Sequence, residues 1–296
     1  MDRTITRRDF LRGAGCAAVA ATMGIPTLQA QEAKPVRKTK VVLIRDEKII
    51  DAKGRLDAEI VKAMLDRAVT ELFGGEKPAA AWKKVVAAND IVGIKSNVWG
   101  PLPTPKAVEA AIKASVMAVG VPEKNIDISD RGVLGSKIFR KATALINVRP
   151  LRTHHWSGVG GLIKNYITFA PELWEYHDNS CADLGTLWRL PICRDKTRLN
   201  ILLMLTPLFH GIGPHHFDSQ FTWPYCGMLA GTDPVALDTI GIMILQAKRK
   251  DYFGRERPLK PAAHHVAFAD IRHNLGISDP QRIKIVRLGW QKDILI

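Results

Sequence analysis

The sequence predicts an α/β protein with a mainly parallel sheet, helices on both faces and an irregular lid segment. Short apolar runs alternate with longer segments of helical periodicity, which is the order that βαβ units require. Polar residues follow several of the apolar runs, where strands of a parallel sheet would end. The 296 residues are 46% hydrophobic and 24% charged, an ordinary globular composition. The length fits one large domain or two interleaved halves, and we expect a single domain over residues 41–296.

The expected elements have recognisable boundaries. Strands are predicted at 41–44, 90–95, 126–129, 144–148, 199–205, 227–230 and 282–288, and helices at 57–73, 105–119, 234–248 and 262–275. Thr104 would cap the second helix and Asp233 the third. The strand from Ala144 is expected to end at Pro150. Residues 170–197 have no regular pattern, and we expect them to form a lid.

The amino terminus has the pattern of a twin-arginine export signal. Arg7 and Arg8 precede a mildly apolar Gly/Ala-rich run over 13–24, and Ala30 is a small residue before a polar stretch. The alternative is a basic amphipathic start to the fold.

With a signal over residues 1–30, the export machinery would be a partner, cleavage would follow Ala30 and residues 31–40 would be a tether. The mature protein would then be periplasmic. No later run reaches the roughly 18 apolar residues that a membrane span needs, so we expect no stable span in the mature chain.

The net charge of +14 is compatible with nucleic-acid binding, but the basic residues are scattered and form no run of five or six. We therefore expect no nucleic-acid partner, and the charge instead favours anionic ligands.

Cysteine usage argues against an iron–sulfur cluster. The mature chain would keep Cys181, Cys193 and Cys226, with no C-x2-C pattern to hold a ferredoxin-type cluster. A disulfide between Cys181 and Cys193 is compatible with an oxidising compartment. The twin-arginine route carries folded proteins, which favours a metal or redox cofactor that the sequence does not identify.

The stretch 144–168 is the main candidate site. His154 could bind a metal or transfer protons, and Lys164 could bind an anion or form a covalent adduct. Glycines 158, 160 and 161 would expose backbone N–H groups beside a helix start, which suits an anion. In the alternative interpretation, His154 bonds structural carbonyls and Lys164 caps a surface.

A second cluster, after the run at 199–205, could hold a transition metal. It contains His210, His215, His216 and Asp218 within nine residues, and His155 is a further candidate ligand. The spacing fits no standard ligand pair on a helix or strand, so the alternative is a polar surface loop with solvated histidines.

Polar residues at other predicted strand ends would complete the first site. Lys95, Asn97, Asp130 and Arg131 follow two strands and would face the same side as Arg152 in a parallel sheet. Such a lining suits a carboxylate or phosphate, although Asn and Asp are also common in loops and caps.

Two further features bear on the same site. Asp238, within the helix that Asp233 begins, is a candidate buried catalytic carboxylate. Tryptophans near the histidine loops favour a flat organic ligand, or else simply core and lid packing: Trp156, Trp174, Trp188 and Trp223.

Four motifs stand in order along the chain. They are Ile94-Lys95-Ser96-Asn97 with Thr104-Pro105, Arg152-Thr153-His154 followed by Lys164-Asn165, the run from Gly231 to Asp238, and Leu275-Gly276. Together they resemble the uncharacterised bacterial and archaeal family named domain of unknown function 362, over roughly residues 41–290. Arg152 stands where the family usually has lysine, and the chain lacks the ferredoxin-like cysteine segment of many relatives. A fainter likeness is to nickel-pincer lactate racemases, in which a histidine also precedes a cofactor-bearing lysine by ten residues, as His154 precedes Lys164.

The expected function is an exported enzyme that uses a metal or metal-containing cofactor on an anionic small molecule, with redox chemistry favoured by the export route. His154, Lys164 and Asp238 would be catalytic. The anion would be bound by Lys95, Asn97, Asp130, Arg131, Arg152 and Asn165. The alternative is a non-catalytic periplasmic protein that uses the same pocket for ligand binding or cofactor assembly.

Overall fold

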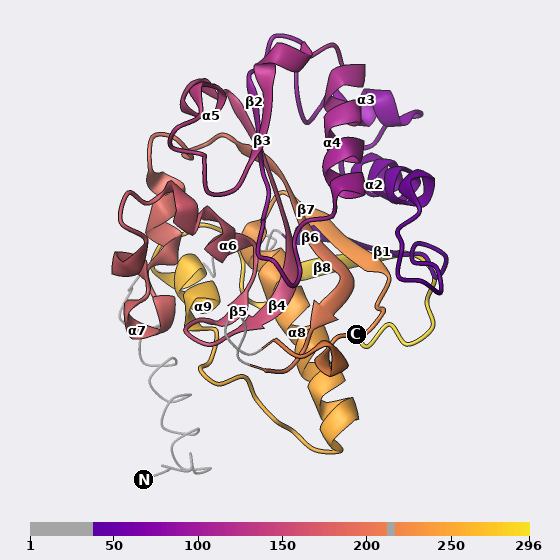
Figure 1. Cartoon of the computed structure of the whole chain (residues 1–296), viewed down its shortest axis with the longest axis vertical. Helices are drawn as coiled ribbons and strands as arrows, with labels where there is room; N and C mark the ends of the chain where they lie inside the picture. The colour runs from indigo at the N-terminus through magenta and orange to yellow at the C-terminus, as the bar shows by residue number, and fades with distance from the viewer. Residues whose placement is uncertain (1–37, 212–216) are drawn as a thin grey trace, which may run out of the picture. The chain divides into compact units, whose positions relative to one another are not determined.

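An eight-stranded sheet organises the part of the chain that the computed structural model describes, residues 38–211 and 217–296 (Figure 1). Its strands are β1 (Thr39–Arg45), β2 (Val92–Lys95), β3 (Ile126–Ser129), β4 (Ala144–His154), β5 (Gly158–Gly160), β6 (Thr197–Leu208), β7 (Gly227–Gly231) and β8 (Ile283–Gly289). The order is β3-β2-β4-β6-β7-β1-β8, and β5 pairs with β4 outside this path. Strand β7 runs antiparallel to both neighbours and β5 antiparallel to β4, whereas the other pairs are parallel. The predicted mainly parallel α/β fold is confirmed.

Helices cover both faces of the sheet. The α-helices are α2 (Ala58–Phe73), α3 (Pro78–Trp82), α4 (Lys106–Ala118), α5 (Lys137–Lys141), α6 (Leu162–Asn165), α7 (Asp178–Cys181), α8 (Pro234–Phe253) and α9 (His264–Ile271). Successive strand residues point to opposite faces, so each strand contributes to two cores. Val42 and Ile44 pack in the core that contains residues of α2 and α4, while Val41 and Leu43 pack in the core that contains residues of α6 and α8.

Short turns of 3-10 helix link these elements. They are η1 (Glu123–Asn125), η2 (Tyr166–Phe169), η3 (Leu173–Tyr176), η4 (Leu184–Arg189), η5 (Ser219–Phe221) and η6 (Pro280–Arg282). The expected lid segment therefore consists mostly of such turns and α7. Cys181, Cys193 and Cys226 are buried free thiols, so the disulfide considered between Cys181 and Cys193 is not formed.

Strand β4 is longer than predicted. It continues through Pro150 to His154, because its pairing with β6 shifts register between Pro150 and Arg152. A proline has no N–H for the ladder, and such a shift accommodates that gap. Arg152 and His154 therefore belong to the strand and pair with Gly160 and Gly158 of β5, so the predicted glycine-rich turn is partly a strand.

The start of α8 follows the predicted signal, whereas α8 continues beyond the predicted end at 248 to Phe253 and α9 is shorter than the helix predicted over 262–275. Asp233 caps α8 by accepting hydrogen bonds from Val235 N and Ala236 N, both at 3.0 Å. Thr104 does not cap α4. Its hydroxyl accepts a hydrogen bond from Asn97 N at 3.1 Å and so fixes the loop after β2. No helix among residues 38–211 and 217–296 has the length and apolar character to cross a membrane.

Candidate functional site

The carboxyl ends of β2, β3 and β4 surround a pocket of about 420 Å³. We call it the strand-end pocket. Its polar lining is Asn97, Asp130, Arg131, Arg149, Arg152, His154, Lys164, Asn165, Thr168 and His177. The structure thus brings together most of the polar residues that the sequence predicts for one site.

Lys95 lies beneath the pocket rather than in its lining. It is fully buried, and its Nζ donates hydrogen bonds to Asp130 Oδ1 at 2.5 Å and to Ser96 O at 2.8 Å. Burial lowers the pKa of Lys95 to about 8, against the opposing effect of Asp130. Burial alone would raise the pKa of Asp130, but Lys95, the Val98 N–H and Arg149 together outweigh it and the pKa is lowered. Lys95 therefore neutralises and orients the carboxylate beside the pocket.

An amide network fixes Asn165 and hence α6 against the sheet. Asn165 Nδ2 donates to Asn147 Oδ1 at 2.8 Å and to Val148 O at 3.2 Å. Asn165 Oδ1 accepts from Asn97 Nδ2 at 3.3 Å. Asn147 Nδ2 in turn donates to Asn200 Oδ1 on β6 at 3.1 Å. Asn165 thus positions the end of α6, and with it Lys164, relative to three strands.

Two arginines of β4 reach the same pocket. Residues three apart on a regular strand point to opposite faces, and the register shift after Pro150 breaks that alternation. Arg149 and Arg152 both lie over Gly160, where a Cβ would be 3.0 Å from Arg149 Nη2 and 3.5 Å from Arg152 Cγ. A side chain at position 160 would crowd the Arg149 guanidinium, and its Cβ would touch the Arg152 side chain.

Each arginine has one contact that fixes its guanidinium group, but its buried Nε atom has no hydrogen-bond partner in the described part of the chain. Arg149 Nη1 donates to Gly161 O at 3.0 Å, and the Arg152 guanidinium lies 4.3 Å from the Trp99 ring centroid. Burial lowers the pKa of Arg149 to about 10 and also lowers that of Arg152, but an arginine side chain keeps its charge at neutral pH.

His154 and Lys164 complete the pocket as two groups with perturbed pKa values. Burial, together with nearby Lys164 and Arg152, lowers the pKa of His154 far below its usual range. Its Nδ1 accepts a hydrogen bond from Trp156 N at 3.2 Å, so the neutral ring carries its proton on Nε2. Burial lowers the pKa of Lys164 to about 8, although its contact with Cys181 Sγ at 3.3 Å opposes this. Near neutral pH, His154 is a neutral hydrogen-bond donor, and Lys164 can exchange a proton.

The backbone N–H groups at the start of α6 are occupied by the protein's own carboxylate. Asp238 of α8 accepts hydrogen bonds from Leu162 N at 2.7 Å and Ile163 N at 3.0 Å. Gly161 allows this approach, because a Cβ there would lie 2.3 Å from Asp238 Oδ1. The anion site expected at this helix start is therefore filled internally, and Asp238 lies outside the lining of the strand-end pocket.

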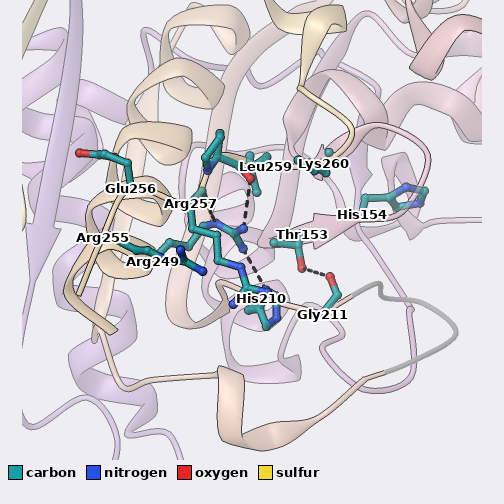
Figure 2. A pocket seen from close by; sticks show the side chains of 12 residues that line it. Thr153, His154, His210, Gly211, Arg249, Arg255, Glu256, Arg257, Leu259 and Lys260 are labelled. Atoms are coloured by element: carbon teal, nitrogen blue, oxygen red, sulfur yellow. Dashed lines mark hydrogen bonds between the residues drawn. The ribbon is translucent and has the colours of Figure 1, made fainter. Parts of the chain in front are cut away.

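His154 also lines a second pocket, of about 560 Å³, together with Thr153, His210, Arg249 and Lys260 (Figure 2). Arg249 is buried and uses its donors to hold the chain around it, with bonds to Arg257 O at 2.7 Å and Phe209 O at 2.8 Å. Arg249 Nη1 lies 3.2 Å from His210 Nδ1, which therefore acts as the acceptor. His210 is thereby used as a structural partner of Arg249.

The predicted metal ligands that fall within the described residues do not lie together as a metal site. His155 stacks on His154 with ring centroids 4.8 Å apart, and Asp218 caps η5 by accepting from Gln220 N at 3.0 Å. His215 and His216 lie outside the described residues. Within 38–211 and 217–296, no three His, Cys, Asp or Glu side chains are grouped to hold a metal ion.

Arg149, Trp99 and His177 are among the lining residues that the sequence does not predict as site residues. The signal for Arg149 was present, because a charged residue inside a continuous apolar strand is rarely buried without a partner or a function. Trp99 and His177 carried no comparable signal, since their places in the pocket depend on how two loops fold over the sheet.

Comparison with family models matches residues 57–243 to the domain of unknown function DUF362. The chain belongs to the DUF362 family. The match includes every residue of the strand-end pocket lining and also Asp238. Comparisons with curated proteins and with solved structures found no match. The membership thus confirms the resemblance seen in the sequence and leaves the activity to be argued from the site.

The structure predicts that Asp238 contributes to stability through the start of α6. Replacing Asp238 with alanine leaves two buried N–H groups without acceptors, so the free energy of unfolding should fall by about 1–3 kcal/mol. Asp238→Asn keeps a carbonyl acceptor and should lose less. Urea unfolding measures both, and an unchanged unfolding free energy in Asp238→Ala would contradict the capping role.

Proposed function

We propose that the strand-end pocket binds a small anionic molecule and that the protein is an enzyme acting on it. The observation that carries this proposal is the unbalanced positive charge of the pocket. Arg149, Arg152 and Lys164 are only 2%, 6% and 4% exposed. Asp130 is the sole carboxylate among the described lining residues, and Lys95 already pairs with it. Buried charges are costly unless they are compensated, and a bound carboxylate or phosphate would compensate these.

The proposed chemistry assigns different tasks to the lining residues. The two arginines hold the anionic group, since a guanidinium matches the geometry of a carboxylate or phosphate. His154 donates a hydrogen bond from Nε2 to an oxygen that gains negative charge, and Lys164 gives or takes a proton. Redox chemistry is favoured by the proposed export route. The alternative is a protein that binds the same anion without converting it.

Binding of a simple anion tests the pocket directly. Sulfate should bind with a Kd that rises at least tenfold in Arg152→Gln, because one of the cations facing the anion is removed. Arg140→Gln, which alters an exposed arginine outside the pocket lining, is the matched control and should leave the Kd unchanged. Isothermal titration calorimetry measures the sulfate Kd of the unaltered protein and of both variants, and an equal Kd in all three would refute the anion site.

If the protein is an enzyme, His154→Ala should abolish turnover of small carboxylates and phosphate esters, as followed by NMR, while sulfate still binds. Absence of turnover in the unaltered protein with all of these compounds would favour the binding protein.

The pH dependence of anion binding should reflect Lys164. Because burial lowers its pKa to about 8, Lys164 is charged below that pH and loses its charge above it. Sulfate affinity should therefore fall roughly tenfold as the pH rises from 7 to 9.5, since one cation near the anion disappears. Lys164→Met should bind sulfate more weakly at pH 7, and its sulfate affinity should change much less with pH. The charge of Lys95 titrates in the same range but is paired with Asp130. A pH-independent Kd in the unaltered protein would contradict this assignment.

We further propose that residues 1–30, which lie outside the described residues, direct export to the periplasm. The support is the arginine pair at Arg7 and Arg8 before the mildly apolar run. Changing both arginines to lysine should leave the protein in the cytoplasmic fraction of a bacterial host that has the twin-arginine machinery. Arg3→Lys is the control and should be exported normally. Equal export of all three forms, measured by fractionation and immunoblotting, would exclude this signal.

A further inference from the structure

We infer that the anion bound in the strand-end pocket carries an aromatic or similarly flat apolar group. This inference rests on the proposed function, since it names the class of anion for the same site. The charged side chains explain only part of the lining. The remaining part is apolar and comes from four separate segments, with Trp99, Leu134, Trp156 and Leu173 among its members.

Three of the large apolar lining residues are exposed to solvent and therefore lie toward the mouth of the pocket. Leu134, Trp156 and Leu173 are 39%, 48% and 41% exposed, in contrast to the buried cations deeper in the pocket. Large apolar side chains gathered at one exposed place are typical of a binding surface, because water contact there is unfavourable until a ligand covers them. An anion without an apolar part would leave all three exposed.

The aromatic rings at the mouth are supported by their neighbours. The Trp156 ring has its centroid 4.2 Å from that of His155 and 4.4 Å from that of His177. The Trp99 ring centroid lies 4.3 Å from the Arg152 guanidinium, and the ring contacts Phe217 edge-on with centroids 5.9 Å apart. These contacts hold two indole rings in the pocket lining, and held indole rings favour a flat partner over a flexible chain.

Charge and apolar surface are therefore arranged by depth. A ligand that enters with its anionic group first would place that group near Arg149, Arg152 and Lys164. Its ring would then lie against the exposed apolar side chains of Leu134, Trp156 and Leu173. The cavity of about 420 Å³ is in the range of pockets that take organic ligands, and an inorganic anion would occupy only a small part of it.

The test compares matched pairs of probes on the full-length protein. Phenyl phosphate should bind at least tenfold more tightly than inorganic phosphate, and benzoate at least tenfold more tightly than acetate. Trp156→Ala should remove most of this gain and change the Kd of inorganic phosphate by less than about twofold, whereas Trp156→Phe should keep the gain. Trp174→Ala is the matched control, because Trp174 is 70% exposed and lies outside the pocket lining.

The possible results separate the inference from the proposed function. If inorganic phosphate binds and phenyl phosphate binds no more tightly, the aromatic class is overturned and the anion site stands. If Trp156→Ala weakens both probes equally, the residue has only a structural role and the inference also fails. If no probe binds to a protein whose thermal unfolding is cooperative, the proposed function fails and the inference fails with it.

Discussion

The site depends on one local constraint, the register shift of β4 after Pro150. It places Arg149 and Arg152 over the same glycine, Gly160, although regular alternation would separate them. Two guanidinium groups in a buried place repel each other, and the protein supplies no free carboxylate beside them in the lining that the structure describes. The geometry of β4 thus keeps two positive charges close together, and a bound anion would stabilise them.

Several of the surrounding polar residues satisfy one another, whereas the two arginines and the Thr168 hydroxyl have buried polar atoms without a hydrogen-bond partner in the described part of the chain. Lys95 pairs with Asp130, and Asn165 bonds to Asn147 and the β4 backbone. Asp238 takes the N–H groups at the start of α6. Buried polar groups with complete partners rigidify a site, because each bond fixes the geometry of the next. These residues therefore position the pocket, whereas the groups with unused hydrogen-bonding capacity are those that can recognise a ligand.

Much of this arrangement could be predicted from sequence, for a physical reason. Parallel strands end on one edge, so polar residues after Lys95, Ser129 and Val148 had to converge there. The end of strand β4 could not be predicted from the sequence. A proline such as Pro150 ordinarily stands at the end or the edge of a β-sheet ladder. The continuation of β4 depends on its pairing with β6, which is distant in the sequence. The place of Arg149 in the pocket and the bonds from the start of α6 to Asp238 likewise depend on long-range packing. Whether a carboxylate lines a pocket or caps a neighbouring helix depends on packing between α8 and α6.

The presence of arginine at position 152 now has a structural interpretation. A lysine there would supply a compact charge with a flexible stem. The Arg152 guanidinium is flat, stacks on Trp99 at 4.3 Å and reaches Asn97 Oδ1 at 3.5 Å. A lysine at this position could keep the charge, but it could not keep the planar contact with the ring. In this protein the charged base of the pocket and its aromatic wall are therefore one connected surface. A ligand that fits both must present its anionic group and its flat apolar group close together.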